Sequence, residues 1–225
     1  MSAPVPGAAA LILASASPRR AQLLAQIGVP YRVIPPELDE QRLPGEPAER
    51  YVRRLAEAKA LKVLRALSAQ PALPALPALP VLGADTAVVV DDEVLGKPAG
   101  REAALQMLSR LSGRTHVVLS AVALALASGT GVRSALSRSE VRFRPLSRTE
   151  CAAYWDSGEP RGKAGGYAIQ GFGAVFIEAL QGSYSGVMGL PLFETAALLA
   201  EAGVAVWTGA GGKDLRGGDG CQRQP

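Results

Sequence analysis

Residues 11–20, Leu-Ile-Leu-Ala-Ser-Ala-Ser-Pro-Arg-Arg, decide the fold because they lead from a buried strand directly into a helix. Residues 11–14 form a short apolar run that is typical of a buried strand. Ser17 is a favourable N-cap and Pro18 a favourable first helical residue, so a helix is predicted to begin at Pro18. Gly28 is expected to end it.

The rest of the chain repeats this alternation of strands and helices. Further helices are expected over residues 47–67, 101–111, 147–158 and 191–203. Further strands are expected over residues 81–90, 116–127, 132–143 and 174–180. The Gly-Thr-Gly at 129–131 makes the second and third of these strands an antiparallel hairpin. The pattern predicts an α/β fold in which helices flank a mixed, twisted sheet.

Length and composition predict one domain. The 225 residues are 48% hydrophobic, which is enough for one substantial core or a single domain of two lobes. Residues 71–80 repeat Pro-Ala-Leu three times and are expected to form an extended linker within that domain. The domain is predicted to span residues 1–208, and the Gly-rich, charged residues 209–225 to form a disordered tail.

Several classes of protein are disfavoured. The longest apolar stretch, residues 121–127, is too short to cross a bilayer, and the N-terminus lacks the charged flank of a signal peptide. Two cysteines imply no disulfide framework, so a cytoplasmic protein is expected. The net charge is +4, aromatics make up 5%, and the basic residues are scattered, so nucleic acid is not the expected partner.

The single histidine, His116, excludes metal sites that need several histidines or cysteines. Any metal ion must therefore be held mainly by carboxylates, which suits a divalent cation such as Mg²⁺ or Mn²⁺. Asp39 and Glu40 supply carboxylates in a loop that follows two prolines.

The first motif has the features of a phosphate site. Free backbone N–H groups at the predicted helix N-terminus favour an anion, and Ser15, Arg19 and Arg20 lie at the same point. Arginine adds bidentate hydrogen bonds to phosphate oxygens. The alternative is a capped helix whose arginines are solvated.

Two charged residues stand at positions that the pattern assigns to the core. Lys59 falls on the apolar stripe of the 47–67 helix, where it either snorkels to the rim or meets an anion. Asp85 interrupts the apolar strand at 81–90, and burial of a carboxylate is costly unless a cation or donors compensate it. We interpret Asp85 as a metal ligand or general base; an end-of-strand aspartate bonded to backbone donors is the alternative.

Two further residues complete the candidate site. Lys97 follows the turn after the 81–90 strand and can return to the neighbourhood of Asp85. Gln170 lies in the glycine-punctuated loop at 163–171, where its amide matches the N3–H and O4 edge of uracil or thymine. A turn in which Gln170 bonds to backbone is equally compatible with the loop. Carboxylates for a metal, together with arginine and lysine for phosphates, indicate phosphoryl chemistry.

Eight motifs in order resemble the Maf family over about residues 10–206. They are Leu-Ala-Ser-Ala-Ser-Pro-Arg-Arg (13–20), Gly-Ala-Asp-Thr (83–86), Leu-Gly-Lys-Pro (95–98), Leu-Ser-Gly-Arg-Thr-His (111–116), Ser-Gly-Glu-Pro (157–160), Lys-Ala-Gly-Gly-Tyr-Ala-Ile-Gln-Gly (163–171), Gly-Ser-Tyr-Ser (182–185) and Gly-Leu-Pro-Leu (189–192). The resemblance implies a two-lobed architecture with a central cleft, similar to that of inosine triphosphatases, and a homodimer.

The same resemblance implies that the chain hydrolyses a nucleoside triphosphate between its α and β phosphates. Asp85 matches the catalytic proton acceptor. The phosphate and metal site is completed by Ser15, Arg19, Glu40, Lys59 and Lys97. Base preference is set at Arg19, Thr86 and Gln170. The segment around Gln170 is similar to that of dTTP/UTP pyrophosphatases, whereas the 7-methyl-GTP group differs there.

Two alternatives stay open. One is a pyrophosphatase with another nucleotide range, including modified pyrimidines, CTP or 7-methyl-GTP. The other is a nucleotide-binding regulator, because relatives have been linked to restraint of septum formation.

Overall fold

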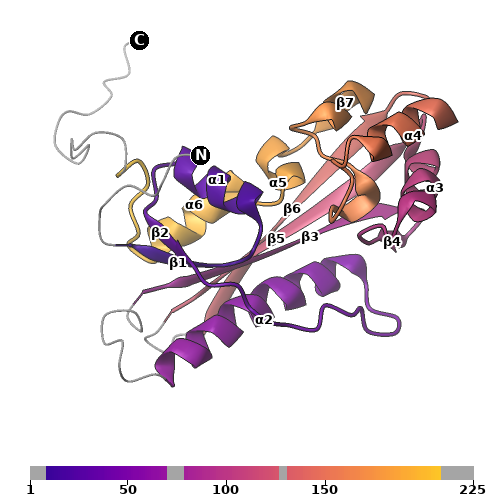
Figure 1. The fold of residues 1–225 in the computed structure, drawn as a ribbon. Coiled ribbons are helices and arrows are strands. Elements are labelled where there is room, and N and C mark those ends of the chain that lie inside the picture. Colours follow the sequence, from indigo (N-terminus) through magenta and orange to yellow (C-terminus); the bar gives the residue numbers. More distant parts are fainter. Residues whose placement is uncertain (1–8, 70–78, 127–130, 209–225) are drawn as a thin grey trace, which may run out of the picture.

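The computed structural model describes residues 9–69, 79–126 and 131–208, which form a seven-stranded sheet with helices on both faces (Figure 1). The strands are β1 (Leu11–Ala14), β2 (Tyr31–Val33), β3 (Val81–Val90), β4 (Glu93–Leu95), β5 (Thr115–Ala125), β6 (Val132–Phe143) and β7 (Ile177–Gln181). The main order is β2-β1-β3-β5-β6-β7, and β4 pairs with β3. β1 runs parallel to β2 and β3, and the other pairs are antiparallel. The predicted α/β fold with a mixed sheet is confirmed.

Helices cover both faces of the long strands. They are α1 (Pro18–Gln26), α2 (Ala48–Ser68), α3 (Arg101–Leu111), α4 (Arg148–Asp156), α5 (Tyr184–Met188) and α6 (Leu192–Glu201), with short 3₁₀ helices η1 (Ala164–Gly166) and η2 (Phe172–Phe176). α2 lies along one face of the sheet, whereas α1, α5 and α6 lie on the other (Figure 1). α3 and α4 contact each other at the far end of the long strands.

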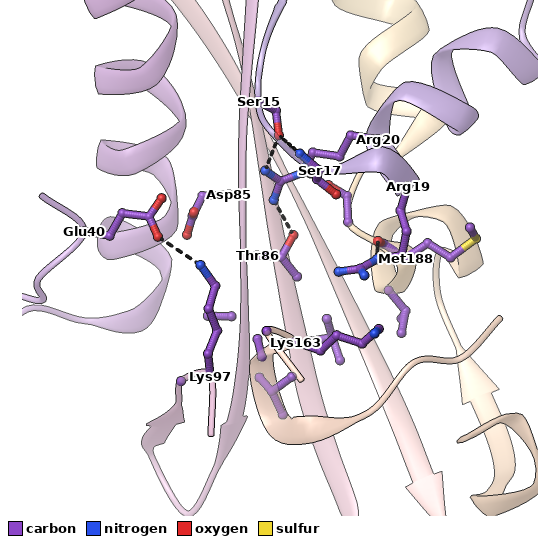
Figure 2. A pocket seen from close by; sticks show the side chains of 18 of the residues that line it. Ser15, Ser17, Arg19, Arg20, Glu40, Asp85, Thr86, Lys97, Lys163 and Met188 are labelled. Atoms are coloured by element: carbon purple, nitrogen blue, oxygen red, sulfur yellow. Dashed lines mark hydrogen bonds and ion pairs between the residues drawn. The ribbon is translucent and has the colours of Figure 1, made fainter. Parts of the chain in front are cut away.

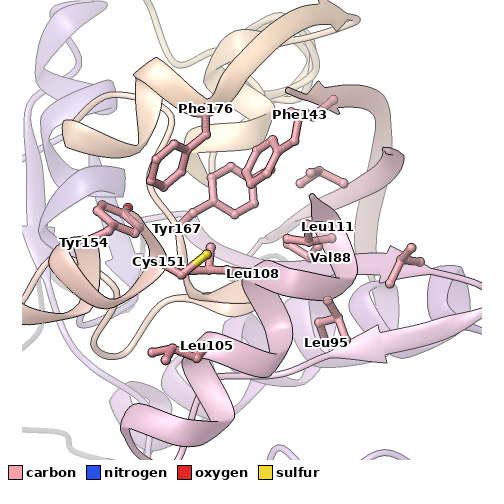
Figure 3. Close-up of a cluster of buried hydrophobic side chains, with 13 residues drawn as sticks. Val88, Leu95, Leu105, Leu108, Leu111, Phe143, Cys151, Tyr154, Tyr167 and Phe176 are labelled. Atoms are coloured by element: carbon pink, nitrogen blue, oxygen red, sulfur yellow. The ribbon is translucent and has the colours of Figure 1, made fainter. Parts of the chain in front are cut away.

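Hydrophobic clusters lie at both ends of the long strands. One joins α1 and α6 to the sheet through Leu24, Leu82 and Leu199. The other, shown in Figure 3, packs α3 and α4 against the aromatic rings of Phe143, Tyr167 and Phe176. The long strands β3, β5 and β6 run from one cluster to the other, so side chains in the middle of these strands lie between the two clusters.

α2 approaches β3 closely at Gly83. A Cβ atom at this position would lie 2.2 Å from the carbonyl oxygen of Ala56 and 2.8 Å from the backbone nitrogen of Ala60. Only glycine admits a helix backbone at this distance, and the helix carries Lys59 between those two alanines. The close approach therefore brings Lys59 against the strand that carries Asp85.

Most predicted elements are present, with small shifts at their ends. Ser17 is the N-cap of α1, although its side chain makes no capping bond, and Ser147 with Glu150 forms the predicted capping box of α4. The predicted strand over 174–180 is wrong at its start, because residues 172–176 form η2 and β7 begins at Ile177. The cause is the 3₁₀ turn itself: the backbone N–H of Ala174 donates to the carbonyl oxygen of Gly171 at 3.1 Å, and that of Ile177 donates to Ala174, instead of to a neighbouring strand.

Three predictions fall largely outside the described residues: the 71–80 linker, the tip of the hairpin at 129–131 and the tail at 209–225. The single-domain boundary at residue 208 stays a prediction. Along the described ranges, no helix has the length and hydrophobicity that crossing a membrane requires.

Candidate active site

β3 changes partners where the candidate site lies. β1 pairs with β3 as far as Gly83, and β4 pairs with it from Val88 onward. Between these points, no described strand pairs with residues 84–87 along this edge, while β5 pairs with them along the other. The chain leaving β1 and the chain leaving β4 therefore diverge around Asp85 and Thr86. In α/β proteins, such switch points in a sheet are where ligands bind.

A pocket of about 490 Å³ occupies this position, a volume suited to a small-molecule ligand. Its walls come from the β1–α1 turn, β3, the segment after β4, the 162–170 loop and the end of α5. The residues assigned to the site from the sequence all line it: Ser15, Arg19, Arg20, Glu40, Lys59, Asp85, Thr86, Lys97 and Gln170. Figure 2 labels all of these except Lys59 and Gln170. Asp39 is not part of this lining; its carboxylate accepts from the backbone N–H of Gln41.

Lys59 is the centre of the acidic side of the pocket. Its Nζ lies 2.7 Å from Asp85 Oδ1 and 2.6 Å from Glu40 Oε1. Lys97 Nζ lies 3.5 Å from the other oxygen of Glu40 (Figure 2). The Lys59 side chain is 7% exposed, so the ammonium does not snorkel to the rim but is buried between two carboxylates.

The pKa values of the two carboxylates are shifted in opposite directions. Burial raises the pKa of Asp85, and the nearby charges of Lys59 and Arg20 only partly oppose this effect. Burial also acts to raise the pKa of Glu40, but Lys59 and Lys97 outweigh it and hold that pKa below its usual range. Asp85 is therefore the stronger base of the pair, although it shares a cation with Glu40.

The two arginines of the first motif have different surroundings. Arg20 donates to the carbonyl oxygen of Gly189 at 2.8 Å, to Ser15 Oγ at 3.2 Å and to Thr86 Oγ1 at 3.3 Å. Arg19 makes a single long bond of 3.4 Å, to the carbonyl oxygen of Met188. Arg20 is thus tied to the protein on several sides, while Arg19 keeps most of its donors for a ligand.

Thr86 continues the Arg20 network into the sheet. Its hydroxyl lies 2.9 Å from Ser120 Oγ, and Ser120 donates in turn to the carbonyl oxygen of Gly186 at 2.6 Å. Because side chains alternate along a strand, Thr86 faces the α1 and α5 side while Asp85 faces α2. Both still line the pocket, since the edge of β3 is open between them.

Gln170 reaches the pocket from the loop that follows η1. Its side chain is exposed and, within the described residues, makes no side-chain hydrogen bond. Lys163, in the same loop, also lines the pocket and was not assigned a role from the sequence. Burial, and then the charge of Arg19, lower the pKa of Lys163. A lysine in a loop with glycines at 162, 165 and 166 is the sequence signal that could have identified it.

The two carboxylates of the pocket are of the type that binds a divalent cation. No group of three or more His, Cys, Asp or Glu side chains in the described ranges is arranged to hold a metal. Glu40 and Asp85 do converge on one point, at Lys59. Mg²⁺ is usually bound by one or two carboxylates together with substrate phosphates, and the chemistry of this pair fits that pattern.

Comparison with known proteins gives the family. Residues 10–202 match the family described as Maf-like protein. A dTTP/UTP pyrophosphatase of Burkholderia lata is 54% identical over 201 residues, covering 87% of this chain and 94% of the relative. A dTTP/UTP pyrophosphatase of Methylococcus capsulatus is 54% identical over 194 residues, covering 86% and 91%. A dTTP/UTP pyrophosphatase of Hahella chejuensis is 47% identical over 203 residues, covering 90% and 97%. With matches of this extent to a family and to its full-length relatives, the chain belongs to the Maf family.

Proposed function

We propose that this chain is a nucleoside triphosphate pyrophosphatase that converts dTTP and UTP to the monophosphate and pyrophosphate. The observation that carries the proposal is the pocket at the switch point of β3, where carboxylates, arginine, lysine and an amide meet. The dTTP/UTP pyrophosphatases that cover most of this chain support the choice of substrate.

Asp85 is the proposed acceptor of the proton from the attacking water. Water adds across the α–β anhydride, one proton passes to the carboxylate, and pyrophosphate leaves. A general base works best when its pKa approaches the working pH, and burial moves the pKa of Asp85 upward from its ordinary value. Lys59 holds the carboxylate in place through its 2.7 Å contact with Oδ1.

The cations around Asp85 are proposed to neutralise the triphosphate. Arg19 and Lys97 have donors available to the pocket, and the helix N-terminus at Pro18 adds backbone N–H groups. Ser15 and Arg20, which are hydrogen-bonded to each other, are proposed to form the pocket wall beside this helix N-terminus. Glu40 and Asp85 would hold a divalent cation, Mg²⁺ or Mn²⁺, which supplies further charge neutralisation at the phosphates when it is bound.

Gln170 is proposed to read the base. Its amide donates and accepts, which matches the O4 acceptor and the N3–H donor that uracil and thymine share. Thr86, with Arg19, borders the same pocket and is proposed to contribute to base preference. The homodimer and the cytoplasmic location expected from the sequence stay predictions.

A substrate panel tests the proposal. Purified protein is incubated with Mg²⁺ or Mn²⁺ and each of dTTP, UTP, CTP, GTP, 7-methyl-GTP and modified pyrimidine triphosphates, and pyrophosphate is measured. We expect release mainly from dTTP and UTP. Asp85→Asn should lower kcat about 10²- to 10⁴-fold, the usual contribution of a general base.

The matched control is Asp91→Asn, which removes the same charge at an exposed turn where Asp91 pairs with Arg114. It should keep wild-type turnover. Release from 7-methyl-GTP alone would overturn the base assignment, and near-full activity of a folded Asp85→Asn would overturn the role of Asp85. If no nucleotide of the panel releases pyrophosphate, the proposed activity itself is refuted.

A further inference from the structure

Glu159 lies just beyond α4, outside the pocket lining, yet it holds the loop that carries Gln170. Its carboxylate accepts hydrogen bonds from the backbone N–H groups of Phe172 and Gly173, each at 3.0 Å. These residues follow Gln170 by two and three positions. The carboxylate therefore fixes the backbone on the C-terminal side of Gln170.

Tyr154 extends the same contact to the other side of Gln170. Its hydroxyl donates to Glu159 Oε1 at 2.7 Å and accepts from the backbone N–H of Ala168 at 3.0 Å. Ala168 precedes Gln170 by two residues. One carboxylate and one phenol thus bracket Gln170, and neither of them touches the pocket.

Glycine at two positions leaves room for the side chains of Glu159 and Tyr154. A Cβ atom at Gly171 would lie 2.0 Å from Glu159 Oε2, and one at Gly173 would lie 2.6 Å from the Tyr154 hydroxyl. Neither glycine has a positive φ, so the reason for glycine is space rather than backbone conformation. The loop is built to lie directly on the carboxylate and the phenol.

The charge state of Glu159 suits this role. Burial acts to raise its pKa, but the hydrogen bonds from Gly173 and Tyr154 outweigh burial and hold the pKa below its usual range. The carboxylate therefore stays an acceptor near neutral pH. The backbone carbonyl of Glu159 also accepts from Lys163 Nζ, which ties a second pocket residue to the same point.

We infer that Glu159 is a positioning residue for base selectivity: it holds Gln170 at the place where the amide meets the pyrimidine edge. The inference rests on the function proposed above, in which Gln170 reads O4 and N3–H. It predicts that loss of the Glu159 carboxylate loosens base reading while the phosphate end of the pocket keeps its hydrogen bonds, since neither Arg19 nor Asp85 accepts from or donates to Glu159 or Tyr154. The charge of Glu159 does act on Arg19, whose pKa it raises against the effect of burial.

Comparison of UTP with CTP tests the proposed contact with Gln170, because the two bases differ only at the edge that Gln170 is proposed to read. Uracil has an oxygen at C4 and a hydrogen on N3, whereas cytosine has an amino group at C4 and no hydrogen on N3. The experiment measures kcat/KM for both nucleotides in wild type, Glu159→Gln, Gln170→Ala and the double variant. Glu159→Gln places an amide group among backbone N–H donors. We expect it to lower the UTP-to-CTP ratio of kcat/KM by up to about tenfold, the net contribution of one hydrogen bond to the base, with kcat for UTP changed far less.

The double variant decides whether Glu159 acts through Gln170. If it does, Glu159→Gln changes nothing further once Gln170 is alanine, so the two effects on the ratio do not add. Tyr154→Phe keeps the ring in the core and removes only the bridging hydroxyl, and it should move the ratio in the same direction. Glu150→Gln is the matched control, since Glu150 also accepts a backbone N–H, that of Ser147, but at the opposite end of α4.

The outcomes separate the two proposals. A wild-type ratio near one, or no turnover of UTP, would overturn the proposed base reading and this inference together. If wild type prefers UTP and Glu159→Gln has the same UTP-to-CTP ratio of kcat/KM, only the inference about Glu159 is overturned. Equal loss of UTP and CTP turnover in Glu159→Gln, with a lower melting temperature as in Glu150→Gln, would assign Glu159 a purely structural role and also refute it.

Discussion

Replacing Lys59 with methionine tests the buried charge cluster most directly. Methionine keeps the length of the side chain and removes the ammonium that lies 2.7 Å from Asp85 and 2.6 Å from Glu40. Removing one partner of a buried ion pair costs about 3–5 kcal/mol, because the remaining charge is left without compensation. Glu40 is 41% exposed and can turn to water, so the loss falls mainly on Asp85.

The pH dependence of the loss follows from the sign of the Asp85 shift. Burial already raises the pKa of Asp85, and Lys59 is the strongest opposing group, so the pKa rises further in Lys59→Met. A carboxyl whose folded-state pKa lies above its unfolded value of about 3.9 takes up a proton on folding. Its ionised form destabilises the protein at high pH, and the penalty is relieved as pH falls through the folded-state pKa. The deficit of Lys59→Met should therefore be largest at pH 8 and shrink toward pH 5.

Urea unfolding at pH 5, 6, 7 and 8 provides the assay, with wild type, Lys59→Met, Asp85→Asn and the double variant compared. Removing Asp85 as well should recover much of the loss, because no uncompensated carboxylate is left at the centre of the site. A deficit below about 1 kcal/mol, which is the value for an exposed pair, would refute the reasoning. So would a deficit that does not vary with pH, or losses in the two single variants that simply add.

Three further outcomes are expected. Gly83→Ala should lower the free energy of unfolding by about 1–3 kcal/mol, as overpacking does, because the new Cβ would lie 2.2 Å from the Ala56 carbonyl oxygen; a melting temperature equal to that of wild type contradicts this. Arg20→Ala should lower stability in chemical denaturation by about 1–3 kcal/mol through the acceptors it leaves unpaired, whereas Arg19→Ala should mainly raise KM for UTP, and the reverse pattern would be contrary to the structure. Chelation with EDTA should stop pyrophosphate release and added Mg²⁺ should restore it, with Glu40→Gln needing more Mg²⁺; turnover that persists in EDTA would rule out the metal.

Much of the fold and of the candidate site was predictable from signals in the local sequence. Asp85 in an apolar strand and Lys59 on an apolar stripe each contradict the surrounding pattern, and the structure places them in contact. Such contradictions are informative because burial of a single charge is costly, so a second one nearby is the usual solution. The capping box at Ser147 was equally local and is present.

Other features depend on contacts that local sequence does not encode. The start of β7 was misplaced because residues 172–176 form a 3₁₀ helix, and at its start the carboxylate of Glu159 accepts from the N–H groups of Phe172 and Gly173. Arg19 and Arg20 are neighbours of identical type, and both donate to carbonyl oxygens at the end of α5, but only Arg20 also donates to the hydroxyls of Ser15 and Thr86. A resemblance between motifs places such residues together but does not say which of them bind ligand and which support the fold.

The partners of Arg19 and Arg20 also bear on how the protein is made. Their carbonyl acceptors, at Met188 and Gly189, lie 169 residues further along the chain. A nascent chain on the ribosome therefore carries the phosphate-binding motif from the start, but that corner stays incomplete until α5 has emerged. Closure over so long a separation is slow, and it makes assembly of the corner a late step in folding. Incomplete translation products that end before Met188 and Gly189 would bear the motif and yet lack these acceptors, so nucleotide binding reports that synthesis has passed α5.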